Sequence, residues 1–393
     1  MSDGRRVAIV GLGVISCAGT SVDAFWDGLN SDPPEGERRV ADFDPAPFYD
    51  SPKNARRADR SQQFAMASTA QAMADAGDLG TNPDRQGVIY GTGVGGLQTF
   101  EDQVLVLDRK GARRVSPFMV PMMMPNAPGA AISMRYGLAG PCEVLTTACA
   151  AATHAIGYGT RLIRADVVDV AVTGGCESVM TPVGTAGFAN MTALSSSGVS
   201  MPFDVNRDGF MMTEGSATLV LEEWDSAIAR GANIHGEVLG VGSNADAHHI
   251  TAPSPGGAGA LRCMQLAIDD AGLTPSDIVH VNAHGTSTPL NDAAEAEALN
   301  KLFGTDGPLV TSTKGVTGHA LGAAGALEAV AVLLSMRHRK IPPTAGWTTP
   351  DPDIPEFNLV TGEAADWEPG PSLSNSFGFG GHNGCLVLGP PTA

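Results

Sequence analysis

The sequence has little positive charge and no long apolar run. Its 393 residues include 24 Lys and Arg against 42 Asp and Glu, which gives a formal net charge of −18. A chain this acidic is poorly suited to bind nucleic acids or anionic membranes, which attract cations. No segment reaches the roughly 18 apolar residues that predict a membrane-spanning helix. Nucleic-acid binding and membrane insertion are therefore not expected.

Cysteine is also scarce. The six cysteines are scattered and form no CxxC pair, and the first residues, "MSDGRRVAIVGLGVIS", lack the apolar length and cleavage site of a secretory signal. We therefore expect free thiols in a reducing cytoplasm. Five of them are interpreted as inert small hydrophobes, namely Cys17, Cys142, Cys176, Cys263 and Cys385.

Nucleotide and metal motifs are missing too. "GLGVIS" (11–16) has Ser16 where the dinucleotide motif GxGxxG needs a third glycine, and "TSTKGVTGH" (311–319) lacks the glycine spacing of a phosphate loop. His280 and His284 have the spacing of zinc ligands on a helix, but "HVNAH" predicts a strand. No cofactor and no metal are predicted.

What the sequence does contain is an internal repeat. "MADAGDLGTNPDRQGVIYGTGVGG" (73–96) resembles "AIDDAGLTPSDIVHVNAHGTST" (267–288). In the same way 5–16 resembles 235–245, and 217–223 resembles 384–390. Short β-prone runs alternate with helical patterns, which indicates mixed or parallel sheets covered by helices. We predict an α/β protein built from two copies of one unit, 1–230 and 231–393.

Two predicted helices are rich in Gly and Ala nearly all round. They are "CAAATHAIGYGTRLI" (149–163) and "GHALGAAGALEAVAVLL" (318–334). A helix without a polar face can be buried on every side and lie close to other backbone. We expect both helices in the centre of the molecule, one from each copy.

Reactive groups lie in four short frames of Gly, Ser and Thr: "TTACAAATH", "NAHGTSTPLND", "TSTKGVTGHALGAAG" and "NSFGFGGHNG". Cys149 opens the first predicted central helix, where the helix N-terminus would lower the pKa of the thiol and direct N–H groups at an oxyanion. From the residues alone, a nucleophile and a core filler are equally open for Cys149. His284 ends a β run, and His319 follows Lys314 by five residues, so a site involving both histidines is favoured.

These segments, in this order, resemble the β-ketoacyl-acyl-carrier-protein synthases of the elongating type, within the thiolase superfamily. The resemblance extends from "VAIVGLGVIS" to "NSFGFGGHNG", nearly the whole chain. It implies the five-layered α-β-α-β-α thiolase-like fold, a dimer and no cofactor. It also implies a decarboxylating Claisen condensation between an acyl thioester and malonyl thioester, both borne by acyl carrier protein.

The resemblance assigns roles by motif. Cys149 would carry the acyl chain, His284 and His319 would bind the malonyl thioester and stabilise its enolate, and Lys314 would orient them with Glu328 as its ion partner. Backbone N–H groups of Cys149 and Phe379 would form an oxyanion hole, and the Phe379 ring would gate the acyl pocket. The residues expected to contact substrate are Thr286, Thr288, Phe377, Phe379 and Gly380.

The chain departs from the family in the loop "SSGVSMPFD" (196–204), which is shortened and has Met201 where Arg is usual. Contacts with the carrier are therefore in doubt there. Basic residues cluster in "KNARRADR" (53–60) and "RKGARR" (109–114), which favours docking of an acidic carrier. The resemblance places the docking residues at Arg56, Arg57, Arg113 and Arg114.

Several alternatives stay open. The methionine cluster "FMVPMMMPNAPGAAI" (118–132) fits an acyl pocket and a dimer interface equally well. A ketosynthase of a type II polyketide pathway, paired with a chain-length-factor-like subunit, has the same motifs as a fatty-acid enzyme. A non-catalytic chain-length partner is disfavoured by the retained Cys149. A degradative thiolase is disfavoured because "NSFGFGGHNG" has no second cysteine.

Overall fold

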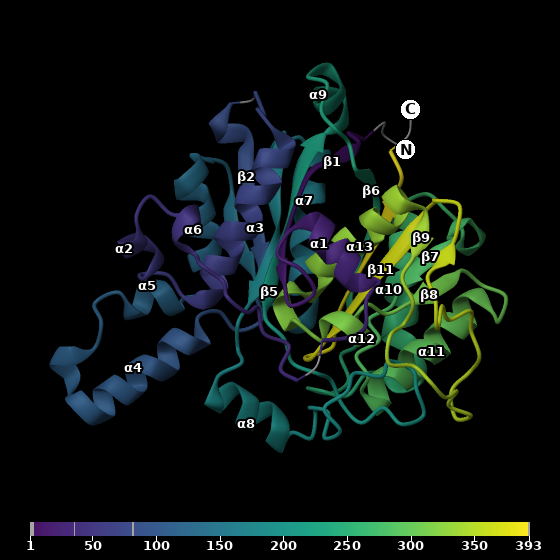
Figure 1. The fold of residues 1–393 in the computed structure, drawn as a ribbon. Helices are drawn as coiled ribbons and strands as arrows, with labels where there is room; N and C mark the ends of the chain where they lie inside the picture. The colour runs from purple at the N-terminus through teal and green to yellow at the C-terminus, as the bar shows by residue number, and fades with distance from the viewer. Residues whose placement is uncertain (1–3, 35, 81, 392–393) are drawn as a thin grey trace.

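The computed structural model describes residues 4–34, 36–80 and 82–391, and Figure 1 shows their arrangement. Ten strands form one sheet in the order β3-β2-β4-β5-β1-β6-β12-β11-β7-β8. The first five of these come from the N-terminal part of the chain and the last five from the C-terminal part. They meet where β1 pairs with β6 through Ala8–Glu237 and Ile9–Gly236.

The strand bounds are β1 Val7–Ser16, β2 Gln86–Gly91, β3 Cys142–Leu145, β4 Val170–Glu177, β5 Gly215–Glu223, β6 Gly236–Ala245, β7 His280–Asn282, β8 Leu309–Thr311, β11 Ser372–Gly378 and β12 His382–Gly389. A separate small sheet joins β9 Lys340–Ile341 to β10 Ala365–Asp366.

Outward from the β1–β6 contact, the two halves of the sheet have the same order. Each has an antiparallel pair first, β1 with β5 and β6 with β12. Each ends in a parallel edge, β2 with β3 and β7 with β8. The three sequence repeats fall on equivalent elements of this arrangement, so the duplicated β/α unit is confirmed. The resemblance implied two sheets, which hydrogen bonds between β1 and β6 join into one.

Helices cover both outer faces and fill the centre (Figure 1). α3 (Arg60–Ala76) packs on β1 and β5, and α10 (Ala258–Asp270) packs on β6 and β12. α7 (Ala151–Arg164) packs on β2 and β4, while α13 (Ala324–His338) contacts β5, β11 and α7. The resulting layers are those of the thiolase-like fold.

The remaining helices are α1 Val22–Leu29, α2 Pro52–Ala55, α4 Leu97–Lys110, α5 Met119–Met123, α6 Ala127–Tyr136, α8 Pro182–Asn190, α9 Trp224–Ala229, α11 Pro289–Phe303 and α12 Lys314–Thr317. α4 projects from the body of the molecule, at the lower left of Figure 1. Its only buried residue is Thr99.

The two central helices differ in burial. Residues 324–336 of α13 are all buried, as expected. By length and composition one helix among the described residues, Leu321–His338, could cross a membrane, but 89% of it is buried inside the structure. It is the core helix of the fold, and its length and hydropathy exceed what the sequence led us to expect. α7 is not buried all round, because His154 and Tyr158 are half-buried and Arg161 is exposed.

Two cysteines also differ from expectation. Cys142 is exposed on the edge strand β3, and Cys17 is half-buried, so neither is a core filler. Cys176, Cys263 and Cys385 are buried as expected, and all six thiols are free.

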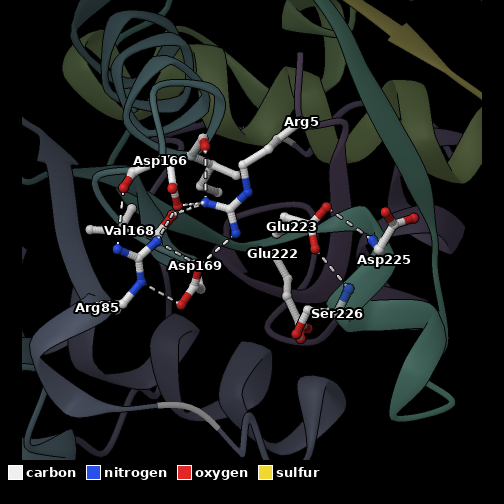
Figure 2. Close-up of polar contacts among 10 residues, drawn as sticks. Arg5, Arg85, Asp166, Val168, Asp169, Glu222, Glu223, Asp225 and Ser226 are labelled. Atoms are coloured by element: carbon white, nitrogen blue, oxygen red, sulfur yellow. Dashed lines mark hydrogen bonds and ion pairs between the residues drawn. The ribbon is translucent and has the colours of Figure 1, made fainter. Parts of the chain in front are cut away.

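A surface ion cluster lies where β1, β2 and β4 begin (Figure 2). Arg5 lies 2.7 Å from Asp166 and 2.5 Å from Asp169. Arg85, just before β2, lies 2.6 Å from Asp169 and 2.5 Å from Asp166. The cluster therefore holds the start of the chain against the turn between α7 and β4.

Candidate active site

Cys149 lies in a sharp bend between β3 and α7. The preceding residue, Ala148, has φ of +49°, a left-handed conformation that side chains rarely adopt. Cys149 itself lies in the 3-10 turn Ala148–Ala150, and α7 begins only at Ala151. The expectation that Cys149 opens α7 is thus corrected by one short turn. A strained, buried bend of this kind persists only where its surroundings hold it.

The surroundings of Cys149 are largely apolar. Its thiol belongs to a buried cluster with Val179, Met180, Phe210, Met212 and Leu321. Burial raises the pKa of the Cys149 thiol to about 11, against the lowering influence of the Phe379 backbone N–H and Lys314. The expectation of a lowered pKa is therefore wrong for this resting state, because desolvation outweighs the helix N-terminus. Cys149 is therefore a neutral thiol in this state.

His319 is placed beside that thiol. Its Nε2 lies 3.1 Å from Cys149 Sγ. It lies between α12 and α13, where its backbone N–H donates to Met211 at 2.7 Å, rather than at the start of α13. Burial, and then Lys314, hold the pKa of His319 well below its usual range, so the ring is neutral. Its Nδ1 has no hydrogen-bond partner among the described residues.

His284 follows β7 at the carboxyl end of that strand, as predicted. Its ring stands 5.3 Å from the His319 ring, centroid to centroid. The Glu295 carboxylate on α11 accepts the backbone N–H groups of His284 and Gly285, both at 2.8 Å. Burial, and then Lys314 and His319, hold the pKa of His284 well below its usual range. Both site histidines are therefore neutral.

Lys314 connects the two histidine segments. Its Nζ donates to the His284 carbonyl at 2.6 Å, lies 3.3 Å from His284 Nδ1, and forms an ion pair with Glu328 Oε1. Because the ammonium group has no acceptor, His284 Nδ1 accepts and the ring proton resides on Nε2. Burial raises the pKa of Glu328 to about 7, against the lowering effect of Lys314.

The hairpin β11–β12 brings Phe377 and Phe379 to Cys149. Gly378 packs so closely on the cysteine bend that a Cβ there would lie 2.9 Å from the Thr147 carbonyl and 3.1 Å from the Cys149 nitrogen. Gly380 has φ of +84°, and its N–H donates to the Ile250 carbonyl at 2.7 Å. The turn thus has the glycine content of a movable segment and is anchored on two sides.

A cavity of about 320 Å³ opens onto these groups. Its lining includes Cys149, both histidines, Phe377 and Phe379. Thr286 and Thr288 also line it, and their hydroxyls lie 2.9 Å apart. The cavity therefore brings together residues from all four segments that the sequence singled out. Of the residues expected to contact substrate, Gly380 is not among those that line it.

Three of these side chains could hold a metal ion by distance alone. The ligand atoms of Cys149, His284 and His319 all lie within 4.8 Å of one another. The positive charge of Lys314, beside His284, repels a dication. Because His284 Nδ1 faces this ammonium group, the ring proton lies on Nε2, the nitrogen that would have to bind the metal ion. The same geometry suits two N–H donors and a thiol acting on a bound thioester.

The predicted docking arginines are exposed and lie just after α2 and in the turn Ala112–Arg114. The Arg57 guanidinium lies 4.0 Å from the centroid of the Phe118 ring, which follows that turn. The shortened loop is well ordered by Asp208, whose carboxylate accepts from the hydroxyls of Ser195, Ser196 and Ser197 at 2.7–3.2 Å.

Two neutral histidines and a thiol, where two copies of a β/α unit meet, define a condensing enzyme of the thiolase-like fold. The family model "Beta-ketoacyl synthase, N-terminal domain" matches residues 34–227, and "Beta-ketoacyl synthase, C-terminal domain" matches 235–348. The chain belongs to the beta-ketoacyl synthase family. It is an acyltransferase of the decarboxylating, condensing type.

Similar proteins cover nearly the whole chain. A 3-oxoacyl-[acyl-carrier-protein] synthase 2 of Synechocystis sp. is 42% identical, covering 98% of both chains. The solved ishigamide ketosynthase/chain length factor has a TM-score of 0.91 and 34% identity, over 99% of this chain and 100% of that one. A type II polyketide ketosynthase solved with its acyl-carrier protein has a TM-score of 0.89 and 27% identity, over 99% and 100%.

The sequence interpretation missed two buried carboxyl groups and one half-buried histidine. Glu295 fixes the His284 backbone, and burial raises its pKa to about 7. Glu177 at the end of β4 accepts from Gly93 and Gly322 at 2.6 and 3.1 Å, joining the two halves beside Cys149. His154 contacts the cysteine bend. Their spacing carries no motif, although "TTACAAATH" ends at His154.

Proposed function

We propose that this enzyme condenses an acyl group on Cys149 with a malonyl thioester, both delivered by an acyl carrier protein, in fatty-acid chain elongation. The observation that carries the proposal is the Cys149–His319 contact of 3.1 Å, with neutral His284 beside it, at the end of one cavity. The site needs no cofactor, because every step uses a thiol, two imidazoles and backbone N–H groups.

Acyl transfer comes first. His319 Nε2 takes the thiol proton, and the Cys149 sulfur attacks the thioester carbonyl, while N–H groups of Cys149 and Phe379 stabilise the tetrahedral oxyanion. The carrier thiolate leaves and receives the proton from His319. The acyl chain then lies against the apolar cluster around Met180, Phe210 and Leu321, with Phe379 at its entrance.

Decarboxylation follows. After acyl transfer the neutral His319 ring moves its proton from Nδ1 to Nε2 by exchange with solvent. The malonyl thioester oxygen then accepts the Nε2–H groups of His284 and His319, and the bond to the carboxylate breaks to release CO2 and leave an enolate. The enolate carbon attacks the acyl carbonyl, and the Cys149 thiolate leaves with the electrons of the C–S bond. The thiolate then takes one proton from solvent, which restores the thiol for the next cycle. Lys314 and Glu328 hold the His284 ring in the tautomer that donates, and Thr286 with Thr288 contact the pantetheine arm.

The second candidate function is a ketosynthase of a type II polyketide pathway. It is favoured by the similarity to a polyketide ketosynthase and to a ketosynthase/chain length factor pair. Both functions use the same residues, so acceptor and product lengths separate them. Either function places the protein in the cytoplasm with its carrier.

Two surfaces support protein partners. Arg56, Arg57, Arg113 and Arg114 offer exposed positive charge on an acidic protein, which suits an acidic carrier. A second ketosynthase-fold chain, as homodimer or with a chain-length-factor-like subunit, would cover the exposed apolar side chains of α4. These are Phe100, Val104, Leu105 and Leu107.

The test is reconstitution with acyl carriers of graded chain length and malonyl carrier, with products identified by mass. A single two-carbon extension of the acyl group, with CO2 in equal amount, supports fatty-acid elongation. Repeated extension that requires a second subunit supports the polyketide function. No extension with any acyl length, by a folded enzyme, contradicts both.

A further inference from the structure

A histidine outside the substrate cavity bridges the two segments that carry the oxyanion donors. His154 lies in the first turn of α7. Its Nδ1 is 2.8 Å from Oγ1 of Thr147, two residues before Cys149. Its Nε2 is 3.0 Å from the backbone carbonyl of Asn383, which pairs with Phe377 across the β11–β12 hairpin.

The partners of His154 define its tautomer. A carbonyl oxygen only accepts, so Nε2 carries the proton and donates it to Asn383, with Ser243 Oγ sharing it at 3.2 Å. Nδ1 of the neutral ring then accepts, and the Thr147 hydroxyl donates. Burial lowers the pKa of His154, which keeps the ring neutral and both bonds in place.

This bridge matters because the two oxyanion donors come from different parts of the chain. The Cys149 N–H belongs to the bend after β3, and the Phe379 N–H belongs to the hairpin turn. The bend is strained at Ala148, with φ of +49°. Gly378 packs so closely on this bend that a Cβ there would lie 2.9 Å from the Thr147 carbonyl. A small shift of the hairpin against the bend would therefore change the distance between the two N–H donors.

We infer that His154 is a positioning residue for acyl transfer, which sets the spacing of the Cys149 and Phe379 N–H donors through its bonds to Thr147 and Asn383. The inference rests on the proposed function, because it requires those donors to act on a tetrahedral oxyanion. Decarboxylation uses His284 and His319 instead and does not depend on the bridge.

Three variants separate the two bonds. His154→Gln keeps a donor near the Nε2 position and loses the acceptor for Thr147, whereas His154→Asn keeps that acceptor and loses the donor for Asn383. Thr147→Val removes the same bond as His154→Gln from its other end, with little change of volume. The substrates are hexanoyl and malonyl thioesters of N-acetylcysteamine, which bypass carrier docking.

We expect each variant to slow acyl-enzyme formation about tenfold, since small misplacement of reacting groups has effects of this order. Formation is followed by quenched-flow and intact mass with the hexanoyl thioester, and CO2 release from the malonyl thioester alone should stay within about twofold of wild type. The double variant Thr147→Val, His154→Gln should be no slower than the slower single variant, because both remove one bond. His235→Gln is the matched control. His235 lies just before β6 and pairs with Asp75 of α3, so this variant should leave both rates unchanged.

The inference is overturned if the variants acylate at the wild-type rate, if acylation and CO2 release fall in equal proportion, or if the two single effects multiply in the double variant. A wild-type enzyme that never acylates Cys149 would instead overturn the proposed function. Unfolding midpoints show whether a variant is folded, and the near-isosteric Thr147→Val reports on the bond even where a His154 variant is unstable.

Discussion

The buried pair Lys314–Glu328 and the surface cluster around Asp169 have the same side-chain chemistry in opposite surroundings. Burial raises the pKa of Glu328 to about 7 in spite of the adjacent ammonium. At the surface, Arg85 and Arg5 lower the pKa of Asp169 to about 2 (Figure 2). The pKa of a carboxyl group beside a cation therefore depends on whether the pair is buried or solvated.

The difference shows what each group of charges does. The surface cluster joins three strands and gains a little stability from favourable pairing. The buried pair is costly to desolvate, so its presence indicates a role in orienting His284 more than a contribution to folding. Each prediction below either separates these two roles or shows that they do not differ.

The largest effect is expected from Lys314→Met. It leaves Glu328 buried without a cation, so the free energy of unfolding should fall by roughly 3–5 kcal/mol. Condensation should fall on the order of 10²–10³-fold, as when an oxyanion donor is lost. Denaturant unfolding and CO2 release measure the two effects.

The double variant Lys314→Met, Glu328→Leu is the control. Replacing both charges by apolar groups should restore much of the stability and none of the condensation. Recovery of condensation in the double variant would mean that the pair is only structural. The matched surface variant, Arg85→Met, should lower stability far less than Lys314→Met and leave condensation at the wild-type rate.

The second prediction concerns opposite pH slopes. Asp169 has a folded pKa of about 2, below its unfolded value, so its contribution is complete above about pH 4 and is lost as pH falls toward 2. Glu328 has a folded pKa of about 7, above its unfolded value, so its contribution is complete below about pH 4 and is lost as pH rises toward 7.

Unfolding free energies of Asp169→Asn and Glu328→Gln, each subtracted from wild type between pH 3 and pH 8, measure these slopes. The wild-type advantage over Asp169→Asn should grow from pH 3 to 5. The wild-type advantage over Glu328→Gln should shrink from pH 4 to 7. Slopes of the same sign would mean that burial does not distinguish the two carboxylates.

Sequence could predict those features of the fold and site that are carried by repetition or by motif. The repeated segments predicted the duplicated unit. The glycine-framed segments, through their resemblance to the family, predicted a site containing Cys149, His284, Lys314 and His319, and the structure brings these residues close together. The pKa of Cys149 could not be predicted, because it depends on apolar neighbours such as Phe210 and Leu321 from distant segments. Desolvation is a property of the assembled interior, and no local pattern encodes it.

Positioning residues were missed for a related reason. Glu295 and His154 act through backbone groups of other segments, and a backbone carbonyl or N–H leaves no mark on the sequence. The burial of α7 was also overpredicted, because its composition does not show that the side of His154, Tyr158 and Arg161 lacks a covering layer. Composition indicates what can be buried, and topology decides what is.

The smallest effect is expected at exposed cations. Arg113→Glu with Arg114→Glu should raise KM for carrier-bound substrates several-fold at low salt and leave the unfolding midpoint unchanged, because exposed charges act mainly on association. N-acetylcysteamine thioesters should react at the wild-type rate. Arg113 and Arg114 would then differ from both the buried pair and the surface cluster, because their charges act on binding of the carrier protein. Unchanged KM for carrier substrates at low salt would remove the docking role.

The most direct test of the account is Cys149→Gln, measured by CO2 release from malonyl carrier beside acyl-enzyme mass. Acyl transfer needs the thiol, whereas decarboxylation rests on His284 and His319, held by the buried pair. The account predicts no acyl labelling and no condensation, with CO2 release retained. His284→Ala should show the reverse, with acyl labelling kept and a loss of CO2 release on the order of 10²–10³-fold. His319→Ala should lose CO2 release to the same extent and keep only slow acyl labelling, because His319 Nε2 also takes the thiol proton. Condensation by Cys149→Gln, or an acyl group on another cysteine of the wild type, would contradict it.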